Sequence, residues 1–132
     1  MTNKTAAPED KFQQERAARE ALAFGLSDLL EDKKAGNVLL LDLEHVNPYF
    51  SIFLIATATS QVQLKSLTRD IYKQFGDQLP RGQGGSGPDD VSSGWVIVDF
   101  IDIVVHLFTQ EKREFYNLER LWGDGKILRG EL

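Results

Sequence analysis

The stretch Trp95-Val-Ile-Val-Asp-Phe-Ile-Asp-Ile-Val-Val-His106 decides the fold of this 132-residue chain. Two runs rich in β-branched residues are separated by a short break, which is the pattern of a β-hairpin. If Phe100 and Ile101 form a two-residue turn, Trp95 lies opposite His106. We therefore predict an antiparallel strand pair whose tip shows an aromatic residue to solvent.

Alternation along these strands separates two faces, because successive side chains point to opposite sides of a sheet. One face is wholly aliphatic and must be core; it carries Val96, Val98, Ile103, Val105 and Leu107. The other face is mixed; it carries Trp95, Ile97, Asp99, Asp102, Val104, His106 and Phe108. We interpret the mixed face as a landing site for a partner. The alternative is that Trp95 and Phe108 pack under a helix and that His106 fills space.

Composition indicates an ordinary soluble globular protein. Hydrophobic residues make up 42% and charged residues 27%, and there is no cysteine. No apolar run reaches the roughly 18 residues that span a bilayer, and the N-terminus has no signal-peptide core, so we expect a cytoplasmic protein. The net charge of −5 is poorly suited to tracking phosphate backbones. We expect no membrane contact, no direct sequence-specific nucleic-acid binding, and a basic protein partner.

The remaining sequence predicts a single α/β (α+β) domain. The order of elements is helix, strand, strand, helix, loop, strand, strand, helix, which indicates one mixed β-sheet flanked by helices. The first helix begins at Pro8 and has apolar residues at Phe12 and along its second half, which we expect in the core. A second helix is capped by Ser60 and ended by Gly76, and its expected core positions include Val62. The two strands between these helices are expected at 38–43 and 50–56.

We divide the chain into three segments. Residues 1–8 are expected to be a disordered start, residues 9–123 the folded domain, and residues 124–132 a weakly ordered tail. Within the domain, residues 76–94 hold two prolines and six glycines and are expected to be a flexible loop. The run Gly82-Gln-Gly-Gly-Ser-Gly87 invites a phosphate-binding interpretation, but no lysine follows in Walker spacing.

The C-terminal half resembles the RsfS/Iojap family of ribosomal silencing factors. The specific strings are Trp95-Val-Ile-Val-Asp99, Asp102-Ile-Val-Val-His106, Arg113-Glu-Phe-Tyr116 and Leu118-Glu-Arg-Leu-Trp122. Weaker likeness lies upstream, in Leu39-Leu-Leu-Asp-Leu43 and Ile55-Ala-Thr-Ala-Thr-Ser60. The resemblance runs from about residue 20 to residue 123, and its last thirty residues are the specific part.

The resemblance implies a fold, a partner and an activity. Members of this family have a nucleotidyltransferase-like topology without catalytic residues and act as binding proteins that need no cofactor. They dock on universal ribosomal protein fourteen of the large ribosomal subunit and obstruct joining of the small subunit. Translation is thereby repressed under starvation or in stationary phase. Family members also form homodimers, and a dimer that hides Trp95 would compete with the ribosome.

Carried onto this chain, the resemblance and the mixed face indicate eight partner-binding residues: Trp95, Asp99, Phe100, Asp102, His106, Arg113, Tyr116 and Glu119. Aromatic anchors dominate interface energetics, so Trp95 and Phe100 at the hairpin tip are the leading contacts. The alternative for the two aspartates is ordinary turn chemistry. The alternative for the last three is internal: Tyr116 packs while Arg113 and Glu119 pair.

The sequence departs from the family pattern at several positions. Ile101 stands where the family usually has glycine, and a β-branched residue tolerates a positive φ poorly, so the hairpin is expected to turn differently. Ala58 replaces the glycine of a Thr-Gly-Thr-Ser turn.

Trp122, seven residues after Phe115, is expected in the core.

An enzyme is the rival hypothesis. A metal-dependent nucleotidyltransferase needs closely spaced carboxylates after Gly-Ser, and that motif is missing here. Asp99, Asp102 and His106 have weak spacing for a metal site, so we predict no enzymatic activity. An adaptor for some other basic protein is the third hypothesis.

Overall fold

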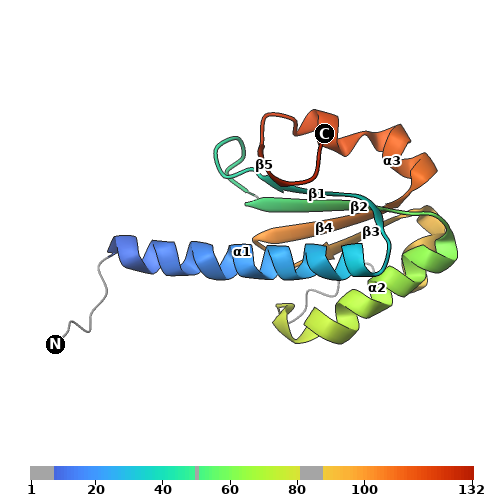
Figure 1. The fold of residues 1–132 in the computed structure, drawn as a ribbon, viewed down its shortest axis with the longest axis horizontal. Coiled ribbons are helices and arrows are strands. Elements are labelled where there is room, and N and C mark those ends of the chain that lie inside the picture. The colour runs from blue at the N-terminus through green and yellow to red at the C-terminus, as the bar shows by residue number, and fades with distance from the viewer. Residues whose placement is uncertain (1–7, 50, 81–87) are drawn as a thin grey trace.

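A five-stranded mixed β-sheet forms the centre of the computed structural model, which describes residues 8–49, 51–80 and 88–132 (Figure 1). The strands lie in the order β3-β4-β2-β1-β5. Their bounds are β1 Gly36–Asp42, β2 Ile52–Ala58, β3 Trp95–Asp99, β4 Ile103–Thr109 and β5 Lys126–Arg129. β2 and β4 are parallel and the other neighbours are antiparallel. The prediction of one mixed sheet flanked by helices is confirmed.

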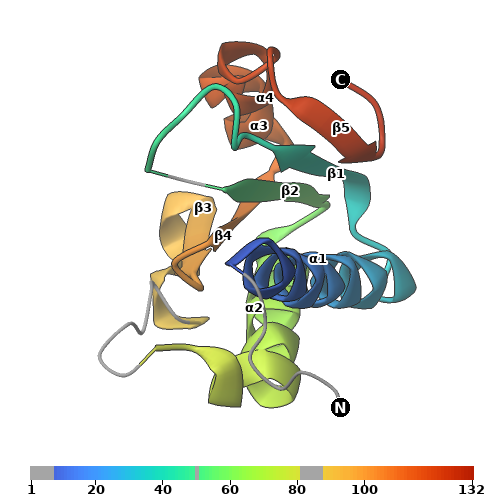
Figure 2. The same cartoon turned by 90° about the vertical axis from the view of Figure 1, so that its left-hand side faces the viewer.

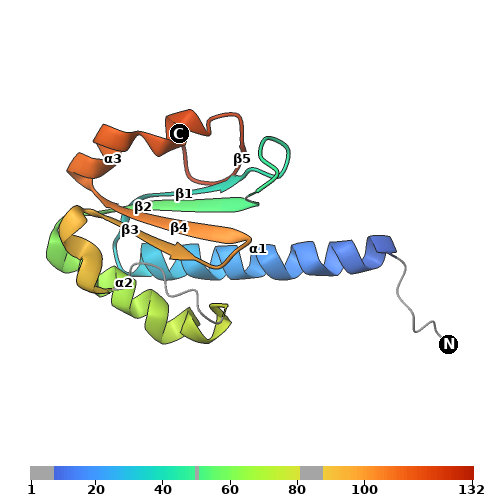
Figure 3. The ribbon, with the colours of Figure 1, turned by 180° about the vertical axis from the view of Figure 1, so that it is seen from behind.

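The helices lie on both sides of this sheet (Figure 2). The long helices α1 (Pro8–Asp32) and α2 (Gln61–Phe75) cover one face. The short helices α3 (Gln110–Tyr116) and α4 (Leu118–Leu121) lie on the other, as the view from behind also shows (Figure 3). None of the helices in the described part of the chain is long and apolar enough to cross a membrane.

The main core lies between the sheet and the two long helices. The aliphatic face predicted for the hairpin is confirmed as part of it, since Val96, Val98 and Leu107 are fully buried there. Two expected core residues are exposed instead, Phe12 (68%) and Val62 (80%). Phe12 lies in the N-terminal half of α1, which extends past the sheet (Figure 1).

The second helix begins and ends as its sequence predicts. Ser60 has extended backbone angles, and its side chain accepts a hydrogen bond from the N–H of Gln63 at 3.1 Å. An N-cap of this kind satisfies one of the free N–H groups of the first turn. Gly76 follows the last helical residue and opens a short 3-10 helix, η1 (Gly76–Gln78).

The turn between β3 and β4 differs from the prediction by one residue. Phe100 N–H donates to the carbonyl of Ile103 at 2.8 Å, so the two turn residues are Ile101 and Asp102. Trp95 therefore opposes Phe108, and Ile97 opposes His106. The pairing shifts by two residues, which leaves the paired strand residues on their predicted faces. Asp102 now belongs to the turn and lies on the α1 side. Burial of Phe100 favours this register, because the predicted turn would have left its ring in solvent.

The C-terminal tail is a strand, contrary to the expectation of weak order. β5 pairs antiparallel with β1 at the edge of the sheet. Arg129 fixes it to α1, because its guanidinium donates to Asp28 at 2.7 Å and to Ser27 Oγ at 2.6 Å. The sequence near Arg129 carries no local pattern that predicts its contacts with α1, so this strand was not expected.

The described parts of the Gly-rich region contain helical structure. Its described parts include η1 and a second 3-10 helix, η2 (Pro88–Ser93), so the segment 76–94 is not loop throughout. The predictions for residues 1–7 and for the glycine run 82–87 lie outside the described residues.

Candidate protein-binding surface

Three aromatic side chains form a partly exposed group on the face of the sheet opposite α1 and α2. The Trp95 ring, half-buried on β3, stacks on buried Phe108 with centroids 5.1 Å apart. Tyr116 from the end of α3 lies 4.5 Å from Trp95, and Phe115 meets Tyr116 edge-on at 5.0 Å. Phe115 is 73% exposed and Tyr116 is 44% exposed. We call Trp95, Phe115 and Tyr116 the aromatic surface.

His106 lies behind the aromatic surface and fixes the orientation of Trp95. The indole Nε1 of Trp95 donates a hydrogen bond to Nδ1 of His106 at 3.2 Å. The imidazole is then neutral with its proton on Nε2, an atom that is buried and has no hydrogen-bond partner among the described residues. Burial lowers the pKa of His106 to about 4. His106 is 5% exposed, so it positions Trp95 and does not itself meet a partner.

A second core closes the other end of the same face. Leu39, Leu41, Phe53 and Phe108 are buried there, with Trp122 packed against them. The Trp122 ring meets Phe53 edge-on at 5.7 Å. The prediction that Trp122 belongs to the core is confirmed. The aromatic surface adjoins this core, because Trp95 packs against the same cluster.

Arg113 is buried, so the prediction that it reaches the partner-binding surface is wrong, while the half-buried Glu119 pairs with it, as the alternative interpretation holds. Arg113 is 5% exposed and donates to the Asn37 carbonyl at 2.7 Å and to Thr57 Oγ1 at 2.9 Å. Its Nε donates to Glu119 at 3.2 Å. The physical reason is a break in the last helix: Asn117 adopts a left-handed φ of 48°, which separates α3 from α4. Tyr116 and Glu119 then no longer share one helical side.

The hairpin tip contributes less to this surface than predicted. Phe100 is 6% exposed and packs in the main core, on the α1 side, so its prediction as an exposed contact is wrong. Asp99 is half-buried, and its Oδ1 accepts a hydrogen bond from Ile101 N–H at 2.7 Å, which is the turn chemistry named as the alternative. Asp102 is exposed but lines a groove beside α1. Of the eight predicted residues, Trp95 and Tyr116 lie on the surface, with His106 directly behind.

Two exposed apolar residues near the C-terminal end of the chain were missed. Phe115 (73% exposed) extends the aromatic surface, and Leu121 (72% exposed) lies on α4. The signal for Phe115 was its place beside Tyr116 in the string Arg113-Glu-Phe-Tyr116. A continuous helix through this string predicts Phe115 on the same side as Trp122, which is half-buried against the second core.

The arrangement is that of a binding surface. Asp99, Asp102 and His106 do not converge: one carboxylate is engaged in the turn, one lies on the α1 side and the imidazole is buried beneath Trp95. Among the described residues, no group of three His, Cys, Asp or Glu side chains is placed to hold a metal ion. The fold is that of a small α+β domain that carries a partly exposed group of aromatic side chains on one face of its sheet.

Comparison with known proteins identifies the family. The model of the family described as "ribosomal silencing factor during starvation" matches residues 14–131. The ribosomal silencing factor RsfS of Bacillus subtilis is 36% identical over 97 residues, covering 74% of this chain and 80% of that protein. The chloroplastic Iojap protein of Arabidopsis thaliana is 34% identical over 108 residues, covering 80% of this chain and 44% of that protein. The chain belongs to the ribosomal silencing factor family, as its C-terminal motifs predict.

A solved structure agrees with this assignment. The crystal structure of a Chromobacterium violaceum protein matches with a TM-score of 0.66 and 28% sequence identity. The match covers 85% of this chain and 92% of that one. The likeness therefore includes almost the whole of the described domain.

Proposed function

We propose that this protein binds universal ribosomal protein fourteen on the large ribosomal subunit, blocks joining of the small subunit and so represses translation under starvation or in stationary phase. The single observation that carries the proposal is the aromatic surface, held in place on a chain of the ribosomal silencing factor family. Its partner-binding core is Trp95, with Tyr116 and Phe115 beside it.

The composition of the surface suits a protein partner. Tyr and Trp bury a large area with little loss of rotamer freedom, and they are enriched at the energetic centres of interfaces. The hydrogen bond from Trp95 to His106 further reduces the freedom that Trp95 loses on binding. A preorganised aromatic patch of this kind binds by burial, so no reacting group is required.

Charge supports a basic partner. The chain has 20 acidic and 15 basic residues, a net charge of −5. Glu111 and Glu114, both exposed, lie on α3 together with Phe115 and Tyr116. Lys112 lies over the Phe115 ring, 5.8 Å from its centroid, so the negative charge belongs to the chain as a whole. A net negative charge speeds encounter with a positively charged protein and disfavours nucleic-acid phosphates.

The proposed action is steric obstruction. A domain of 14.9 kDa bound beside the face that meets the small subunit would occupy space that the joined ribosome needs. The proposal therefore includes no enzymatic step and no cofactor, and it places the protein in the cytoplasm. Two copies of the chain that met through the aromatic surface would hide Trp95, so a homodimer would be a stored form that dissociates on the ribosome.

Co-sedimentation with separated large subunits, small subunits and joined ribosomes tests the proposal. We expect selective binding to large subunits and fewer joined particles when small subunits are added afterwards. Binding to neither subunit would overturn the ribosomal function. Binding to large subunits without any loss of joined particles would overturn the blocking action alone.

A further inference from the structure

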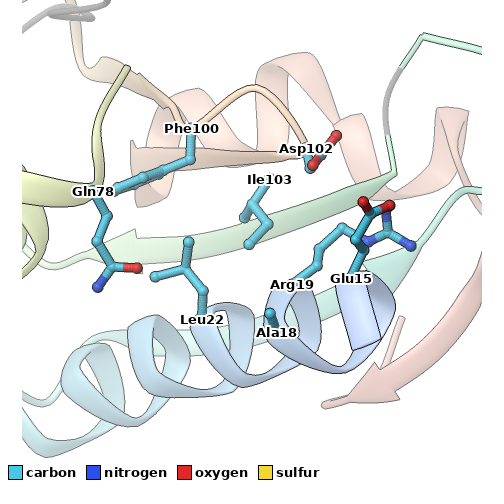
Figure 4. A pocket seen from close by; sticks show the side chains of 8 residues that line it. All are labelled: Glu15, Ala18, Arg19, Leu22, Gln78, Phe100, Asp102 and Ile103. Atoms are coloured by element: carbon cyan, nitrogen blue, oxygen red, sulfur yellow. The ribbon is translucent and has the colours of Figure 1, made fainter. Parts of the chain in front are cut away.

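A groove lies between α1 and the β3–β4 turn, on the side of the sheet away from the aromatic surface (Figure 4). Its volume is about 520 Å³. α1 provides one wall and the turn the other, with Gln78 of η1 at one end. The ribosomal function proposed above makes no use of this groove.

The groove has an apolar floor and an acidic rim. Leu22 and Ile103 belong to or pack against the main core, and Ala18 lies beside them on α1. Glu15 and Asp102, both exposed, lie on opposite walls (Figure 4). The groove is thus suited to a ligand with an apolar body and a polar end.

The charge at the rim is not neutralised within the protein. Arg19 also lines the groove, but its guanidinium lies 3.6 Å from Glu44, a carboxylate that pairs with Arg16 as well. No ion pair involves Glu15 or Asp102 in the part of the chain that the structure describes. The groove is therefore lined by two carboxylates and one guanidinium, and neither carboxylate forms an ion pair with it.

The wall formed by the turn is fixed in position. The backbone N–H of Asp102 donates to the Phe100 carbonyl at 3.0 Å, and its own carbonyl accepts from Ile52 N–H at 2.9 Å. The backbone of Asp102 is thus held on both sides, which fixes the place on the turn from which its side chain extends.

We propose that this groove binds an arginine side chain from a basic polypeptide partner. The three-carbon stem of arginine would lie on Ala18 and Leu22, and the guanidinium would lie between Glu15 and Asp102. An anionic ligand would meet two like charges, and a wholly apolar ligand would desolvate both carboxylates without a partner. Arginine satisfies the floor and the rim together.

The test is a titration of the ¹⁵N-labelled protein with the capped peptide acetyl-Gly-Arg-Gly-amide, followed by NMR. We expect saturable shifts of the amide signals of Ala18, Leu22 and Ile103. The same peptide with citrulline in place of arginine keeps the shape and lacks the charge, and it should bind far more weakly. The double variant Glu15→Gln/Asp102→Asn should lose about fivefold to thirtyfold in affinity.

A matched control removes two exposed acidic groups elsewhere: Asp124→Asn/Glu131→Gln changes the net charge equally and should keep the affinity of the unmodified protein. The proposal is overturned if the two double variants bind equally well, if the citrulline peptide binds as tightly as the arginine peptide, or if no saturable shift occurs. Since the aromatic surface is untouched, each of these results leaves the ribosomal proposal unaffected.

Discussion

Trp95 owes its position to three neighbours: Phe108 beneath its ring, Tyr116 beside it and His106 at its indole nitrogen. Residues that approach it from a partner would meet an aromatic face already fixed in orientation. Because rigid aromatic anchors carry a large share of binding energy, Trp95 is the residue whose removal should affect ribosome binding most.

We predict that Trp95→Ala lowers affinity for large subunits by roughly 2–4 kcal/mol, a loss of at least about thirtyfold. Quantitative co-sedimentation measures this, with circular dichroism to establish that the variant is folded. Phe12→Ala is the matched control, since Phe12 is an exposed aromatic residue on α1, far from the surface. A folded Trp95→Ala variant that binds like the unmodified protein would mean that the surface is assigned wrongly.

His106 should make stability depend on pH. Its pKa is lowered from 6.5 to about 4 by burial, so the unfolded chain takes up this proton at higher pH than the folded one. The neutral imidazole therefore contributes its full stability above pH 6.5, and that contribution is lost as the pH falls toward 4. The loss for this one group is on the order of 3 kcal/mol at most.

Urea unfolding of the unmodified protein and of His106→Phe, measured across this range, isolates the effect. The carboxylates titrate alike in both proteins, so the difference between the two curves belongs to His106. We expect the free energy of unfolding of the variant to fall less steeply with acidification. Parallel curves would show that His106 is not buried as a neutral group.

At the scale of elements, the β3–β4 turn carries strain. Ile101 has a φ of +76°, in the left-handed region that a β-branched residue disfavours, and its side chain is 54% exposed. We predict that Ile101→Gly raises the free energy of unfolding by about 1 kcal/mol, because glycine adopts this φ without steric conflict. Chemical denaturation measures the change.

The control for this prediction is Ile127→Gly. Ile127 is also partly exposed (42%) but lies in strand β5, opposite Leu41 of β1, where glycine should destabilise. If Ile101→Gly destabilises the protein as Ile127→Gly does, the turn is not strained in solution.

Arg113 joins four elements. Its contacts run to Asn37 at β1, to Thr57 on β2 and to Glu119 on α4, and Arg113 itself lies on α3. We predict that Arg113→Met costs about 3–5 kcal/mol of stability, since it leaves the Glu119 carboxylate buried without a charge partner. Thermal or urea unfolding measures this loss.

The double variant Arg113→Met/Glu119→Gln should recover part of that stability, because the second change removes the unpaired charge. Independent, additive losses in the two single variants would contradict the account of Arg113 and Glu119 as a coupled pair.

At the scale of the whole molecule, local signals predicted most of the elements. Alternation in the 95–108 stretch gave the two faces of the hairpin, and the capping serine and terminal glycine gave the bounds of α2. Two expectations were wrong: weak order in residues 124–132, and exposure of Arg113 on α3. β5 is held by Arg129, which bonds Ser27 and Asp28. These residues lie 102 and 101 positions earlier in the sequence, and no local pattern predicts such a contact.

The kind of site, an aromatic surface on the sheet, could be predicted from the sequence, but only some of its residues could. Trp95 and Tyr116 follow from their motif and their strand face. The burial of Phe100 depended on a one-residue choice of turn, and the burial of Arg113 depended on the left-handed conformation of Asn117. Both are decided by packing across the fold, which outweighs the local preference of each residue.

We propose that the aromatic surface contacts universal ribosomal protein fourteen. The most direct test places a photo-crosslinking amino acid at Phe115, which is exposed at the edge of that surface, and illuminates the protein bound to large subunits. A second protein with the same group at Phe12 is the control. We expect crosslinks from position 115 to ribosomal protein fourteen and none to it from position 12. Crosslinks from position 115 to a different ribosomal component, with none to ribosomal protein fourteen, would contradict the account.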